Sequence, residues 1–387
     1  MTGIWRRGRD RQWGAGFLVI LAAVLVLVEG CGGGGSDAEY VDPTAEHLQE
    51  DTTPDPQVLP NAPPGGDPPG EVGPVSEPLL QELPPPESDP RPEPDLQVET
   101  ALTVLPSTIE PGESARVEVR GAADAAEVLV MVEEHVASLV QIKGDEEIWL
   151  GYVSVTPLAE EGSHPLTVEL LDGAGEVLDS LEGAFEVALP PPPPAPDPDG
   201  GDMVDDGSPA VDDPVEAIAL PPEVLALLTP ENARIDDMVR FEVHSNVSGP
   251  PRWSGPWIRP VDGIDDSPFG QLRSFNGGPP TDWHHGHDFI VAQAMPIWAA
   301  AAGTVAFAGS LPLHGNGVII DHGAGVFSGY WHMSEVNVVA GVEVIGGVEI
   351  GLVGSTGVST GPHLHWEVVV NGQDVDPVQW LESELHL

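Results

Sequence analysis

The chain has 387 residues, of which 43 are proline and 46 are glycine, and its formal net charge is −50 at pH 7. Proline-rich, like-charged segments bury too little apolar surface to fold, so part of the chain is expected to be linker. Phosphate backbones are normally bound by Lys/Arg clusters, and this chain has 13 basic residues against 63 acidic ones, which argues against a nucleic-acid partner.

Residues 1–30 have the pattern of a lipoprotein-type signal peptide. Four arginines within the first eleven residues precede an apolar run, 15–28, that is too short to cross a bilayer comfortably. Cys31, the single cysteine, follows and is expected to be lipidated after cleavage. An uncleaved anchor and an ordinary secretory signal are the alternatives. All three predict an extracytoplasmic protein, and Gly32 is compatible with an outer membrane where the organism has one.

Two stretches, 31–97 and 189–213, are expected to be disordered linkers. The first passes from glycine and serine into Pro/Asp/Glu-rich text, and the second opens with a run of five prolines. Such segments stay extended at about 3 Å per residue. The first linker could therefore hold a folded domain well away from a lipid anchor at the membrane.

Residues 98–188 are predicted to form a small immunoglobulin-like β-sandwich. Short apolar or alternating runs recur there between Pro-Gly and Asp-Gly turn signals. The clearest runs are 115–119, 128–132 and 166–170. The segment contains no cluster of catalytic residue types, which favours a spacer or a wall-binding module.

Residues 214–252 are expected to be a lead-in segment that packs on the last domain. They contain an apolar stretch at 224–228 and a strand-like run at 239–243. Whether this segment inhibits a site in the last domain is left open by the sequence.

The chemistry concentrates in residues 253–387, because eight of the 13 histidines fall between His284 and His365. The first motif places His284 and Asp288 four residues apart around Gly286. Imidazole and carboxylate both suit Zn²⁺ at about 2.0 to 2.2 Å, and the glycine would let the backbone bend so that both side chains converge.

The other two motifs lie in strand-like text. In an extended strand His363 and His365 share one face and Leu364 the other, and the same alternation puts Tyr330 and His332 on a common face. Each histidine alone could be structural. Together with the His/Asp pair they make five candidate groups for a metal site. Catalytic zinc keeps three protein ligands and one open position, so two imidazoles would be left beside the metal.

The order His-x-Gly-x-Asp, Tyr-x-His and His-Leu-His, the last inside Gly-Ser-Thr-Gly-Val-Ser-Thr-Gly-Pro-His-Leu-His, resembles the lysostaphin/LytM family of zinc endopeptidases. Further matching text lies at 267–273, 315–323, 346–351 and 376–377. The resemblance implies a β-rich core of antiparallel sheet with the site in a groove. It also implies one Zn²⁺ per domain and peptides of peptidoglycan as the substrate.

The family pattern assigns zinc ligation to His284, Asp288 and His365. It assigns His332 and His363 to catalysis, where they bind or deprotonate the attacking water and stabilise the oxyanion. The sequence as a whole is therefore predicted to be a mainly β protein, a hydrolase that is tethered at the cell envelope.

Two alternatives remain open at this point, one for the ligand register and one for the function. His285 and His287 replace residues that are usually not histidine, so another ligand register is conceivable, although the spacing to Asp288 favours His284. His314 and His322 are expected to be structural. Some family members have lost zinc ligands and regulate cell-wall amidases instead, which makes an amidase the partner expected of an inactive relative.

Overall fold

The computed structural model describes residues 99–133, 135–142, 148–190, 215–246, 249–280, 282–382 and 385. They belong to one compact unit, Asp89–Leu387. The predicted signal peptide, Cys31 and the linker 31–97 lie outside the described residues, as does most of the linker 189–213. Among the residues described, no helix is long and apolar enough to cross a membrane.

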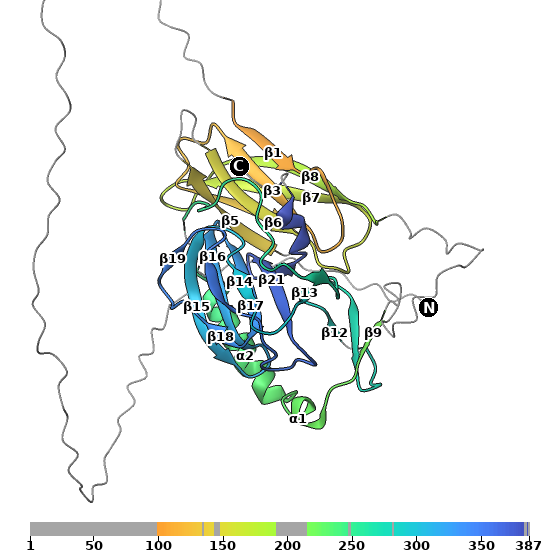
Figure 1. The fold of residues 1–387 in the computed structure, drawn as a ribbon. Coiled ribbons are helices and arrows are strands. Elements are labelled where there is room, and N and C mark those ends of the chain that lie inside the picture. The colour runs from red at the N-terminus through yellow and green to blue at the C-terminus, as the bar shows by residue number, and fades with distance from the viewer. Residues whose placement is uncertain are drawn as a thin grey trace, which may run out of the picture. The chain divides into compact units, whose positions relative to one another are not determined.

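Eight strands make up the N-terminal part of this unit (Figure 1). They are β1 (Ala101–Leu105), β2 (Thr108–Ile109), β3 (Ser114–Arg120), β4 (Glu127–Val132), β5 (His135–Ile142), β6 (Ile148–Ser154), β7 (Gly162–Leu171) and β8 (Val177–Val187). They are hydrogen-bonded in the order β1-β3-β6-β5-β4-β7-β8-β2, antiparallel except for the β2–β8 pair.

The alternation of side chains along these strands produces one buried face. Val117 of β3, Val128 of β4 and Val168 of β7 are buried in a common core. Leu102 of β1 lies against Gly183 of β8, so the two ends of the hydrogen-bonded order face each other. The predicted mainly β architecture, with a small sandwich ahead of a β-rich C-terminal domain, is confirmed.

The C-terminal part contains thirteen further strands and a final 3₁₀ turn. They are β10 (Ile264–Asp265), β11 (Leu272–Phe275), β12 (Asp282–Trp283), β13 (His287–Ile290), β14 (Pro296–Trp298), β15 (Gly303–Leu311), β16 (Gly315–Gly323), β17 (Val326–Met333), β18 (Glu335–Val336), β19 (Glu343–Val344), β20 (Glu349–Leu352), β21 (His363–Val370), β22 (Gln373–Val375) and η1 (Val378–Leu381). The main sheet has the order β10-β13-β21-β17-β16-β15-β19, with β22 beside β21, and every pair in it is antiparallel. There are also two three-stranded sheets, β14-β20-β18 and β12-β11-β9, in which β9 spans Val215–Ile218.

The two faces of strand β21 carry different kinds of residue. Leu364, Trp366 and Val368 point into the largest core and are fully buried there. His363, His365 and Glu367 alternate with them and therefore lie on the opposite face. The predicted split between Leu364 and its two flanking histidines is what the strand shows.

The lead-in segment folds as β9 (Val215–Ile218), α1 (Pro222–Leu225) and α2 (Pro230–His244). Residues 239–243, whose sequence is strand-like and left their structure unassigned, belong to α2. Thr229 caps the start of this helix, and its side chain accepts a hydrogen bond from the amide of Asn232. Val239 and Val243 pack on the sheet. They are four residues apart, a spacing that puts both side chains on one face of a helix, although the same run also alternates as a strand does.

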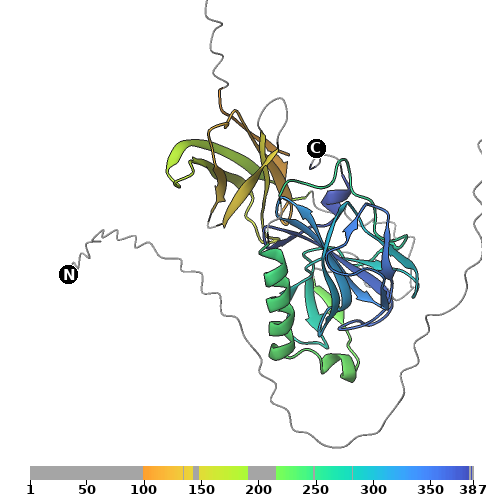
Figure 2. The ribbon, with the colours of Figure 1, turned by 90° about the vertical axis from the view of Figure 1, so that its left-hand side faces the viewer.

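The lead-in segment is built into the C-terminal domain. Strand β9 pairs in parallel with β11, and Val239 and Val243 of α2 pack against a cluster that includes Phe327, Trp331 and Val369. Figure 2 shows α2 running alongside the strands of the main sheet. The expectation that this segment packs on the last domain agrees with these contacts.

The sandwich and the C-terminal domain share part of one core. Tyr152 of β6 lies against Trp253 and Trp380, with ring centroids 6.1 and 5.3 Å apart, and Trp257 joins the same cluster. The side-chain amide of Gln379 binds both the backbone amide and the carbonyl of Ser114, at 2.8 and 2.9 Å.

Candidate metal centre

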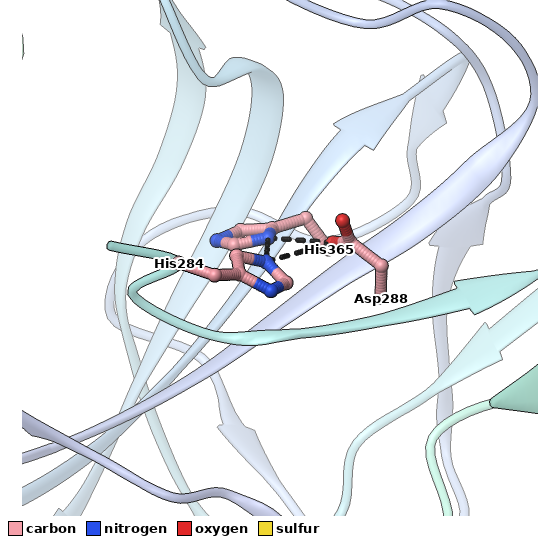
Figure 3. Close-up of side chains that lie close together, drawn as sticks. All are labelled: His284, Asp288 and His365. Atoms are coloured by element: carbon pink, nitrogen blue, oxygen red, sulfur yellow. Dashed lines mark hydrogen bonds and ion pairs between the residues drawn. The ribbon is translucent and has the colours of Figure 1, made fainter. Parts of the chain in front are cut away.

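Three buried ligand atoms converge between β13 and β21 (Figure 3). His284 Nε2 lies 2.9 Å from His365 Nδ1 and 3.2 Å from Asp288 Oδ1, and the last two atoms are 2.7 Å apart. Asp288 and His365 are direct partners in the β13–β21 register, which fixes their separation. Tetrahedral ligands at about 2.1 Å from zinc lie roughly 3.4 Å apart, so this triangle needs to open only slightly.

The hydrogen bonds behind these histidines aim their lone pairs at the same point. His284 Nδ1 lies 3.0 Å from the carbonyl oxygen of Pro268, and His365 Nε2 lies 3.0 Å from Glu367 Oε1. Because those acceptors take the ring N–H, the opposite nitrogen of each ring is left free to bind a metal. The residues present therefore fit a zinc ion.

The carboxylate of the triad is held by an arginine. Arg273 donates to Asp288 Oδ2 at 2.6 Å and to Glu216 Oε2 at 2.9 Å, so Asp288 Oδ1 is left facing the two histidines. Glu216 belongs to β9 and reaches the site through Arg273 and Ser267. The arginine thus orients the carboxylate in the way that outer-shell partners orient metal ligands generally.

Gly286 has a different role from the one expected. It is absent from the glycines with positive φ, so no unusual bend requires it. A Cβ at this position would meet the carbonyl oxygen of Trp366 and the ring of His365. The glycine is needed because the His284–Asp288 loop passes directly over β21.

The three side chains of the triad shift one another's pKa values. Burial lowers the pKa of His284 to about 4, so this ring is neutral. Burial opposes ionisation of Asp288 as well, but the charge of His365 and the hydrogen bonds from His284 and His365 hold its pKa well below the usual range. Against burial, Asp288 and Glu367 raise the pKa of His365 to about 9. A cation bound here would take the place of the proton on His365.

The two predicted catalytic histidines flank the triad. The ring centroids of His332 and His363 are 4.7 Å apart, and His363 Nε2 lies 3.9 Å from Asp288 Oδ1. Their Nδ1 atoms lie 2.7 and 2.8 Å from the carbonyl oxygens of Thr356 and Gly361. By the same tautomer argument, each leaves Nε2 as a hydrogen-bond acceptor.

The prediction that Tyr330 and His332 share a face is wrong. Tyr330 is fully buried in the main core, where its hydroxyl binds Ser328 and the amide of Ala300, whereas His332 lies beside His363. The β16–β17 register shifts next to this point, and His332 has a φ of 61°. This bulge breaks the period of two and turns His332 toward the site.

The remaining histidines of the region have other partners. His285 lies between Asp282 and Asp374, and His287 binds Asp265, so the structure brings His284 to the triad and leaves the alternative register unused.

His322 is fully buried, with its ring nitrogens 2.8 Å from Ala302 O and 2.7 Å from Ser328 Oγ. This agrees with a structural role. His314 binds Asp236 at 2.6 Å and approaches Glu367 at 3.4 Å, which places it beside the site.

Two residues that the sequence reasoning did not assign support the ligands directly, namely Arg273 and Glu367. Glu367 could have been found, since it lies two residues after His365 in a strand and must share its face. Arg273 lies at the end of the matching stretch 267–273, but its contact with Asp288 could not be read from that stretch, because the pairing of β11 with β9 and β12 brings the two residues together.

Two hollows adjoin the site. One, of about 280 Å³, is lined by Glu216, Asp266, Ser359 and His363 among others. The other, of about 190 Å³, is lined by Trp283, His285, His314 and His365 among others. Both are also lined by Arg273, Phe275, His332 and Val358, so the two hollows share part of their walls.

The model of peptidase family M23 matches residues 282–377, which contain all five predicted site residues. These residues belong to peptidase family M23. Over 95 residues the chain is 47% identical to DD-carboxypeptidase/endopeptidase Mpg of Neisseria meningitidis serogroup B, covering 24% of this chain and 22% of that protein. Over 96 residues it is 38% identical to peptidoglycan DD-endopeptidase ShyA of Vibrio cholerae serotype O1, covering 25% and 22%.

Among solved structures, the catalytic domain of lysostaphin from Staphylococcus simulans is 32% identical, with 32% of this chain and 94% of that chain covered and a TM-score of 0.29. The match of residues 282–377 to the model of peptidase family M23 confirms the predicted peptidase family for that domain. The matches to the two curated relatives span about a fifth of their length, 22% in each.

Proposed function

We propose that the M23 domain is a zinc-dependent endopeptidase that hydrolyses peptide bonds of peptidoglycan. The observation that carries this proposal is the convergence of His284 Nε2, Asp288 Oδ1 and His365 Nδ1 beside two further imidazoles. Zinc held by these three atoms would supply Lewis acidity that activates water and the scissile carbonyl group.

The chain's own residues would move the protons. His332 is neutral because burial keeps its pKa well below the usual range, so its Nε2 accepts a hydrogen bond. His363 donates through Nδ1 to the carbonyl oxygen of Gly361, which leaves its Nε2 as an acceptor. Either ring can take a proton from the attacking water, and the protonated ring then donates to the oxyanion or to the leaving amine.

The substrate class is supported from two directions. The relatives that match the domain carry peptidoglycan or DD-peptidase names. The lipoprotein-type signal and the acidic linkers in the sequence suit a wall-facing enzyme on a tether. The alternative is an inactive regulator of wall amidases. Such a protein does not need a complete site, so the presence of all five polar residues favours the peptidase.

The first test is the release of soluble peptides from purified peptidoglycan by the full chain in detergent. We expect release by the zinc-loaded protein, its loss after treatment with a chelator, and its return when zinc is restored. Mass spectrometry of the products would identify the bond. A folded, zinc-loaded protein that releases nothing from several wall types would contradict the proposal, and activation of a purified wall amidase would then be assayed.

We also propose that Cys31 carries the lipid anchor that places this domain at the cell envelope. Its support is the arginine-rich start, the short apolar run 15–28 and the single cysteine, which follows that run after two residues. The chain is expected in the membrane fraction, and a Cys31→Ser variant in the soluble or unprocessed fraction. Equal membrane retention of a fully processed variant would count against lipidation.

A further inference from the structure

The buried carboxylate of Glu367 links the metal centre to helix α2. Glu367 is 1% exposed, and it accepts hydrogen bonds from His365 Nε2 at 3.0 Å and from Trp331 Nε1 at 2.9 Å. The guanidinium of Arg240 completes this set at 3.2 Å from Glu367 Oε2. A buried carboxylate needs such a cationic partner, because desolvation otherwise makes its charge unfavourable.

The same guanidinium also supports the other side of the triad. Arg240 donates to Asp374 Oδ1 at 2.7 Å, and Asp374 Oδ2 lies 2.9 Å from His285 Nδ1. His285 directly follows the ligand His284. Through Glu367 and Asp374, one arginine therefore supports both of the chain segments that carry the ligating histidines.

A second residue of the same helix braces the loop beside the site. Asp236, one turn before Arg240, is 1% exposed, and its carboxylate accepts from the amides of Leu313 and His314 at 3.0 Å each and from His314 Nδ1 at 2.6 Å. His314 Nε2 in turn lies 3.4 Å from Glu367 Oε1. Helix α2 thus contacts Glu367 both directly and through His314.

The geometry points to Arg240 as a positioning residue of the metal centre, one that fixes Glu367 against His365 and Asp374 against His285 from a helix outside the family-matched residues 282–377. This inference rests on the proposed zinc site. Its consequence is that the lead-in segment is part of the metal centre, since removal of α2 would leave Glu367 and Asp374 without their shared cation.

The test is zinc affinity of the full chain, measured by competition with a chromophoric chelator. Arg240→Gln is expected to raise the dissociation constant by about 10- to 100-fold, the usual cost of losing an outer-shell partner. Cobalt(II) bound in place of zinc should show an altered visible spectrum, since the orientation and basicity of His365 change. Arg240→Lys keeps the charge and should recover part of the affinity.

The matched control is Arg234→Gln, on the same helix, where Arg234 makes an exposed ion pair with Glu231. It should bind zinc and cobalt as the unaltered chain does. The inference is overturned if Arg240→Gln keeps the affinity and cobalt spectrum of the unaltered chain, or if the control loses as much.

If Arg240→Gln fails to fold, Arg240→Met combined with Glu367→Gln removes the buried charge pair together and should show the same loss of affinity. Unchanged affinity in that double variant also overturns the inference. An unaltered chain that binds no zinc overturns the proposed centre itself. Zinc binding without peptidoglycan cleavage instead contradicts the proposed substrate and leaves the role of Arg240 to be decided by the affinities.

Discussion

A His363→Ala variant is expected to lose about 10²- to 10⁴-fold in turnover of peptidoglycan peptides while it keeps its zinc. His363 is bound to Gly361 through Nδ1 and lies 3.9 Å from the nearest oxygen of Asp288, beside the three ligand atoms and outside their triangle. Its removal therefore takes away a proton acceptor and leaves the triad intact.

The measurement is the rate of peptide release at saturating peptidoglycan together with the zinc content of the dialysed protein. His365→Ala is the comparison, because it removes a ligand and should lose both zinc and activity. If His363→Ala loses its zinc as His365→Ala does, then His363 is a ligand and the assignment of roles is wrong. If it retains full turnover, His332 alone serves as the base.

Trp380→Ala is expected to lower the free energy of unfolding by about 3 to 5 kcal/mol, the usual cost of emptying a large aromatic site in a core. Trp380 is fully buried, and its ring lies 5.0 Å from Trp257, 5.3 Å from Tyr152 and 6.0 Å from Trp253. The cavity would open where the sandwich and the C-terminal domain share their core.

Urea unfolding followed by tryptophan fluorescence and circular dichroism would measure this loss. Phe241→Ala is the matched control, because Phe241 is an aromatic residue of α2 that is 75% exposed and should change stability by no more than about 0.5 kcal/mol. A loss for Trp380→Ala as small as that of the control would mean that the aromatic cluster does not stabilise the fold.

Much of the site could be read from short stretches of sequence because its geometry is local. Period two in a strand is enough to place His363 and His365 on one face and Leu364 on the other, and β21 has that arrangement. His284 and Asp288 needed only a loop that lets two positions four residues apart converge.

Local rules failed where a neighbouring element changes the backbone. His332 faces the site because a bulge against β16 and a positive φ turn it. Simple alternation would have placed His332 on the core face with Tyr330. The run 239–243 satisfies both the strand and the helix periods, and the cap at Thr229 together with packing on the sheet selects the helix.

By itself the sequence determined the mainly β class, the family resemblance and the five polar residues of the centre, because these depend on residue types at short spacings. Only the tertiary structure decided which charges support them. Arg273 reaches Asp288 through the pairing of β11 with its neighbours, and Arg240 reaches Glu367 across 127 positions of the chain. Contacts at such separations depend on how strands and helices pack, and no local period encodes that packing.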